Sequence, residues 1–159
     1  MRSHLTAEEA VNVFTLRGLH IERETYQSLS DAGLLPPIAT RTLLEEIDTE
    51  IEELQLGGLR VDAARRAHLP WYGRLHRTVL GWLPEPFGED LTSVAYIEVS
   101  ARRLAAHKAA EELERFTDLP GVDAAQVEAA KATFAHWEKS AGTTLAELET
   151  DIEVDQAGT

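Results

Sequence analysis

The strongest structural signal in this chain is an apolar residue at every third or fourth position over residues 38–55, which predicts a helix with one apolar stripe. A similar but looser pattern precedes it over residues 6–30, and Gly33 and the Pro36–Pro37 pair separate the two. Glycine can supply the left-handed residue that ends a helix, and proline cannot continue one. We therefore expect an antiparallel helical hairpin. The stripe of the second helix consists of Leu43, Leu44, Ile47, Ile51 and Leu54.

The first helix is expected to begin at a capping box. Thr6 is followed three residues later by Glu9, and in this motif each side chain accepts a hydrogen bond from the backbone N–H of the other residue. Tyr26 and Leu29, near the end of the helix, are expected to face the stripe of the second helix. In its first half, the residues expected to be buried are Ala10, Val13, Phe14 and either Leu16 or Leu19.

A long third helix is predicted from Asp90, which can cap it, to about Thr117. The stretch before it, residues 84–88, contains two prolines and a glycine and is predicted to be a loop. The small residues of the helix allow another helix to approach it closely. Its predicted buried side consists of Val94, Ile97, Ala101, Ala105, Ala109, Leu113 and Phe116.

The last helix has the most regular pattern. Leu119–Gly121 is expected to turn the chain, and Asp123 with Gln126 can then form a second capping box. Apolar residues follow at steps of three or four, which predicts an amphipathic helix that pairs with the third one. They are Val127, Ala130, Phe134, Trp137, Ala141, Leu145, Leu148 and Ile152.

These patterns predict an all-α fold, an antiparallel helical bundle of about four long helices with one or two short helices between them. We expect one domain over residues 1–153, followed by a frayed tail at 154–159. The domain divides into a hairpin (6–55), a basic connecting segment (57–88) and a second hairpin (90–153). The predicted core includes Ile47, Ile51, Phe134, Trp137 and Leu145.

Composition excludes several classes of protein. The chain has no cysteine, which rules out disulfides and cysteine-type zinc sites. No apolar run approaches the about 20 residues needed to cross a bilayer, and the N-terminus lacks the apolar core of a signal peptide, so we expect a soluble chain. The net charge of −13 argues against nucleic-acid binding, because phosphate contacts need a positive surface.

The sequence has no residue arrangement typical of catalysis or metal binding. None of the six histidines has a glutamate three residues before it, as the di-iron sites of helical bundles require. There is no Gly-x-Ser-x-Gly turn to present a nucleophile and no glycine-rich phosphate loop. We therefore predict that the chain is not an enzyme and binds no metal or cofactor.

One enzymatic alternative comes from the acidic second helix. The run LLEEIDTEIEEL, between Arg41 and Arg60, resembles the first helix of all-α chorismate mutases. Those enzymes hold two substrate carboxylates with cations on the helix, which stabilise the transition state electrostatically. Here residues 55–57 stand where that family places an arginine, and the acidic helix would repel a dicarboxylate. This alternative is therefore less favoured than a non-catalytic role.

The positive charge of the chain is concentrated in its middle. Residues 57–82 carry a charge of +4, which leaves −17 on the rest of a chain whose total is −13. Two interpretations stay open: the arginines pair with the acidic helices while the tryptophans fill the core, or the segment contacts an anionic membrane or a partner. The candidate contact residues are Arg65, Arg66, Trp71, Arg74, Arg77 and Trp82.

Two stretches resemble the cytoplasmic C-terminal helical domain of bacterial monovalent cation/proton antiporters of the sodium/proton exchanger type. The first runs from IERETYQSL at residues 21–29, through Gly33–Leu35, to LLEEID at residues 43–48. The second is ARRLAAHKAAEEL at residues 101–113, which resembles the alanine-rich helix of the same tails. Together the two stretches span 41 of the 159 residues, about a quarter of the chain.

The resemblance implies a non-catalytic regulatory or assembly domain of a longer membrane transporter, on the cytoplasmic side of the cell membrane. It also implies a homodimer, because the transporters of this type are dimeric. The ion-carrying aspartates of the family lie in membrane helices, so no transport residue is assigned to this sequence. The competing interpretation is a free-standing helical adaptor or interaction protein.

Overall fold

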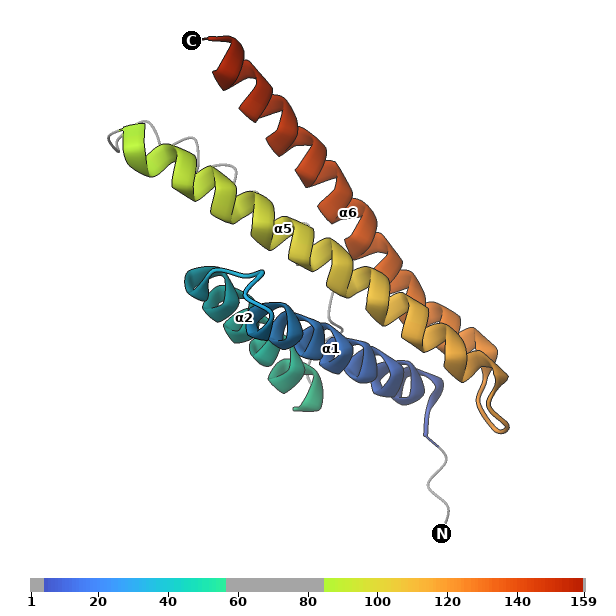
Figure 1. The fold of residues 1–159 in the computed structure, drawn as a ribbon. Helices are drawn as coiled ribbons and strands as arrows, with labels where there is room; N and C mark the ends of the chain where they lie inside the picture. The colour runs from blue at the N-terminus through green and yellow to red at the C-terminus, as the bar shows by residue number, and fades with distance from the viewer. Residues whose placement is uncertain (1–4, 57–84, 159) are drawn as a thin grey trace.

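The computed structural model describes residues 5–56 and 85–158, and every regular element in these ranges is a helix. This confirms the all-α bundle with four long helices (Figure 1). The short helices expected between the hairpins, and most of the basic connecting segment, lie outside the described residues. In chain order the elements are α1 (Ala7–Asp31), α2 (Pro37–Gln55), α5 (Glu85–Glu114), the 3-10 helix η1 (Arg115–Asp118) and α6 (Ala124–Ala157).

The first hairpin has the predicted caps. Thr6 Oγ1 accepts a hydrogen bond from the Glu9 backbone N–H at 3.2 Å, and Glu9 Oε2 accepts one from the Thr6 backbone N–H at 2.7 Å. The hydrogen bond that the Glu9 carboxylate accepts from the Thr6 backbone, and then the Thr6 side chain, favour its charged form and lower the pKa of Glu9. At the other end, Gly33 has a φ of +73°, the left-handed conformation that lets the chain leave α1 and enter α2 at Pro37.

The third helix begins earlier than predicted. α5 starts at Glu85, so the loop expected over residues 84–88 is wrong for residues 85–88, and Asp90 lies inside the helix instead of capping it. Proline is tolerated in the first turn of a helix because its missing N–H would have no partner there, and Pro86 occupies such a position.

The last helix is capped by Asp123, although without the reciprocal bond predicted for Gln126. Asp123 Oδ1 accepts a hydrogen bond from the Ala125 backbone N–H at 2.9 Å, which satisfies one free donor of the first turn. α6 then continues past residue 153 to Ala157, so the expected frayed tail is partly helical. No proline occurs in this stretch, and the backbone N–H of Gly158 closes the last turn on Val154.

The two hairpins pack against each other through α5 and α1. Figure 1 shows α1 and α2 side by side below α5, with α6 on the other side of α5. α1 and α5 each contact the other three long helices, so these two helices together form the centre of the core. The N-terminal part of α5 and the C-terminal part of α6 extend beyond the α1/α2 hairpin (Figure 1).

The core contains all five residues that the sequence predicted. Phe134 is 0% exposed and Trp137 4%, and Ile47, Ile51 and Leu145 are also buried. The buried alanines of α5, 101, 105 and 109, let neighbouring helices approach closely as expected.

One prediction for the first helix is wrong. Val13 is 52% exposed, whereas Leu19 is fully buried and Thr15 and Gly18 share its side of α1. Because α1 packs against three helices, its buried side is wide and includes small and polar residues. The buried side of α1 predicted from its apolar residues alone therefore differs from the observed one by a rotation about the helix axis.

Candidate functional site

The six residues predicted to contact a membrane or a partner, Arg65, Arg66, Trp71, Arg74, Arg77 and Trp82, lie outside the described residues. The structure therefore does not choose between the two interpretations of the basic segment. Two other polar features stand out in the described part of the chain: ion pairs between neighbouring helices and a groove between α5 and α6.

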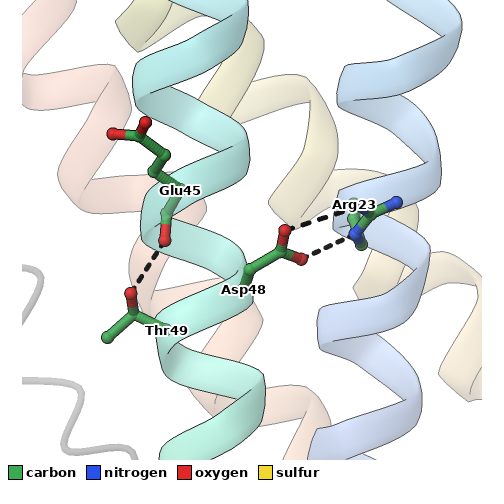
Figure 2. Close-up of polar contacts among 4 residues, drawn as sticks. All are labelled: Arg23, Glu45, Asp48 and Thr49. Carbon is green, nitrogen blue, oxygen red and sulfur yellow. Dashed lines mark hydrogen bonds and ion pairs between the residues drawn. The ribbon is translucent and has the colours of Figure 1, made fainter.

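The first ion pair joins the two helices of the first hairpin. Figure 2 shows that Arg23 of α1 donates to Asp48 of α2. Its Nε lies 2.6 Å from Oδ1 of Asp48. The hydrogen bond to Asp48, and then its negative charge, raise the pKa of Arg23. Both side chains are more than 40% exposed, so solvent screens the pair and it contributes little stability. On the same helix, Thr49 Oγ1 donates to the Glu45 carbonyl at 2.8 Å (Figure 2).

The second ion pair joins the two hairpins in a more buried place. Arg102 of α5, which is 9% exposed, forms an ion pair with Glu46 of α2. Two further carboxylates are almost completely buried, Glu22 of α1 at 0% and Glu98 of α5 at 3%, and both take part in interactions of their own. Buried charges occur in proteins when they are paired, because desolvation is otherwise costly.

Sequence reasoning missed these buried charges because it assigned the acidic residues to solvated helix faces. A signal for one of them was present. Glu22 lies at steps of three and four from Leu19 and Tyr26, which are both buried, so it belongs to the same side of α1. A charged residue in register with an apolar stripe therefore marked a polar position in the core.

The groove lies on a face of the α5/α6 pair to which neither α1 nor α2 contributes a residue. Its volume is about 520 Å³, and it is open to solvent along its length. Each helix contributes five residues, at the spacings of one helix face. They are Tyr96, Ser100, Arg103, Leu104 and His107 from α5, and Glu138, Gly142, Leu145, Ala146 and Glu149 from α6.

Polar contacts close the groove at both ends. Tyr96 donates its hydroxyl to Glu149 at 3.1 Å, and His107 Nδ1 lies 3.0 Å from Glu138 Oε1. The two contacts are eleven residues apart on each helix, or about 16 Å along the axis. An ion pair between Glu114 and Lys131 continues the series towards the turn. In all three pairs the residue numbers have the same sum, so α5 and α6 keep one antiparallel register.

Arg103 lies in the middle of the groove. A Cβ atom placed on Gly142 would be 3.7 Å from Nε and Cζ of Arg103, so the guanidinium group lies on the bare backbone of α6. Arg103 is exposed and forms no ion pair with any residue in the described ranges. Beside it, Leu104 is 38% exposed. The groove therefore presents a cation and an apolar side chain between two acceptor-rich ends.

The contact at Tyr96 gives a testable pH dependence. The hydrogen bond to Glu149, and then its negative charge, raise the pKa of Tyr96. The stability from this contact is complete below the pKa of an unfolded tyrosine, about 10, and is lost as the pH rises through the higher folded value. In an ultraviolet titration we expect Tyr96 to ionise later than a free tyrosine and Glu149→Gln to bring its pKa down. An unchanged titration curve for Glu149→Gln would contradict this contact.

Within the described ranges, no group of three or more histidine, aspartate or glutamate side chains could hold a metal ion. None of the described helices combines the length and the apolar character needed to cross a bilayer. Comparisons with protein-family models, with curated proteins and with solved structures found no match to this chain. The α5/α6 groove is the candidate site, because it brings together Arg103, which has no ion-pair partner among the described residues, and the exposed Leu104.

Proposed function

We propose that this chain is a non-catalytic helical domain that regulates or assembles a bacterial monovalent cation/proton antiporter from the cytoplasmic side. The observation that supports a binding role is the open α5/α6 groove. It contains Arg103, which has no ion-pair partner among the described residues, and the exposed Leu104. The antiporter assignment comes from the resemblance of residues 21–48 and 101–113 to the helical tails of these transporters.

The architecture suits such a role. α5 and α6 are 30 and 34 residues long, so each spans about 45–50 Å as one rigid element. A long helical pair can hold transporter subunits together at a fixed distance, while the shorter α1/α2 hairpin stiffens its lower half through the core (Figure 1). Binding at the groove would then change the distance or the angle at which the rigid helical pair holds the transporter subunits.

The same groove also supports the alternative of a free-standing helical adaptor, because a docking surface needs no membrane anchor. The two functions differ in what is encoded next to this chain. If the antiporter assignment is correct, the reading frame continues upstream of Met1 into several apolar segments of about 20 residues each.

The antiporter assignment is tested with the complete reading frame. Everted membrane vesicles from cells that lack their own sodium/proton exchangers would carry either the complete protein or a version without residues 5–158. We expect the shortened protein to exchange cations with a changed rate or pH profile, because it lacks its regulatory part. An upstream region without apolar segments, or identical exchange at every pH, would contradict the assignment and favour the adaptor.

A further inference from the structure

The charges of the α5/α6 groove are divided between its two edges. The α5 edge carries Arg103 and His107, and the α6 edge carries Glu138 and Glu149. Of these, Arg103 has no ion-pair partner among the described residues, whereas Glu138 and Glu149 each accept a single contact from α5. A carboxylate can accept several hydrogen bonds, so both glutamates keep free capacity. A partner that complements this groove must place an acidic edge over α5 and a basic edge over α6.

We propose that the groove binds a second copy of this chain, related to the first by a twofold axis that runs along the groove. A rotation about this axis places α5 of each copy over α6 of its partner, at the same level along the helices. Arg103 then faces the segment between the partner's Glu138 and the partner's Glu149, and the reverse contact forms at the same time. Each exposed Leu104 lies over the small residues Gly142 and Ala146 of the partner subunit.

The charge pattern distinguishes this arrangement from the other twofold symmetry. An axis across the helices would place α5 over α5 and α6 over α6, so the basic edges of the two copies would face each other and so would the acidic edges, and like charges at close range are unfavourable. With the axis along the groove every neighbouring helix is antiparallel, as it would be with the other axis, so the charge pattern alone separates the two arrangements. The four helices then form an up-and-down bundle, in which neighbouring helix dipoles oppose one another.

The surface is large enough for a stable dimer. α5 has 30 residues, so the pair is about 45 Å long, and two packed helices are about 20 Å wide. This face measures about 900 Å², and stable protein interfaces bury about 800 Å² on each partner. Association must overcome the repulsion of two chains with a net charge of −13, which makes specific pairs such as Arg103 with glutamate necessary.

Cross-linking distinguishes the symmetries, because the chain has no cysteine and one introduced thiol is unique. Ser100→Cys and Ala146→Cys chains, each carrying one thiol, would be treated with a short bis-maleimide, alone and as a mixture. We expect covalent dimers chiefly in the mixture, because Ser100 of one copy faces the partner's α6. Dimers of Ser100→Cys alone would indicate the axis across the helices and overturn the proposal.

A charge reversal tests the energetics on the full 159-residue chain. We expect sedimentation to show a dimer above micromolar concentration, and Arg103→Glu to weaken it by about tenfold or more, corresponding to about 1.4 kcal/mol. Arg41→Glu is the matched control, because Arg41 is exposed on α2, away from the groove. A monomeric wild-type chain, or equal effects of the two reversals, would overturn the proposal. Both assays use the isolated chain, so they stand whether or not it belongs to an antiporter.

Discussion

Replacing Gly18 with alanine is expected to destabilise the fold by about 1–3 kcal/mol, the range for overpacked cores. A Cβ atom at this position would lie 2.2 Å and 2.3 Å from Cε2 and Cζ of Phe134. Phe134 is 0% exposed, so its ring cannot move away without displacing other core residues. Alanine favours a helix over glycine by about 1 kcal/mol, so helix propensity alone would make the variant more stable. A loss of stability would therefore report the clash with Phe134.

Gly142 provides the matched control, because it is also a glycine inside a helix. A Cβ atom there would be 3.7 Å from the Arg103 guanidinium, an ordinary van der Waals distance. We expect Gly142→Ala to be neutral or to stabilise the protein by up to about 1 kcal/mol through helix propensity. Urea denaturation of the two variants measures the difference. If both variants gain stability, the close approach of α1 and α6 is wrong.

Truncating Trp137 to alanine is expected to cost about 3–5 kcal/mol, the largest effect among our predictions. The residue is 4% exposed, and its ring meets the edge of Phe134 with centroids 5.1 Å apart at an interplanar angle of 87°. Truncation would leave a cavity beside Phe134 and remove this aromatic contact. A loss of this size is a large part of the 5–15 kcal/mol by which domains are typically stable.

Trp137→Phe is the control, because it keeps an aromatic ring and a smaller cavity. We expect it to lose clearly less stability than Trp137→Ala in the same urea titration, followed by helical circular dichroism. A loss below about 1 kcal/mol for the alanine variant would be the value of a surface position and would contradict the core described above.

The helices and most of the core could be predicted because they follow from local patterns. The spacing of Leu43, Ile47 and Ile51 marks the buried face of α2, and Thr6 with Glu9 marks the start of α1. The errors arose where tertiary packing decides. Val13 is apolar but lies on the exposed side of α1, and Glu22 is charged but lies on the buried side. No rule based on the local sequence tells that position 22 is buried and position 13 exposed, because this depends on which helices pack against α1.

The groove could not be predicted for a different reason. Its contacts join residues far apart in the sequence, such as Tyr96 with Glu149, so they depend on the register of two helices. A shift of one residue would turn these side chains away from each other. The sequence suggests that the two helices pair, but their register is decided by the turn and by the packing of the buried residues of the core.

The constant register of α5 and α6 has a consequence for the order of folding. The three polar contacts along this face join residues 17, 31 and 53 positions apart, starting with Glu114–Lys131 beside the turn. Closing a loop costs more entropy as it lengthens, but once the first contact has formed, each later one closes only a short extra segment. The contacts of the α5/α6 hairpin can therefore form one after another, starting next to the turn at Gly121 and moving away from it. Of the three contacts, the one between Tyr96 and Glu149 at the far end of the groove would be the last to form and the first to open.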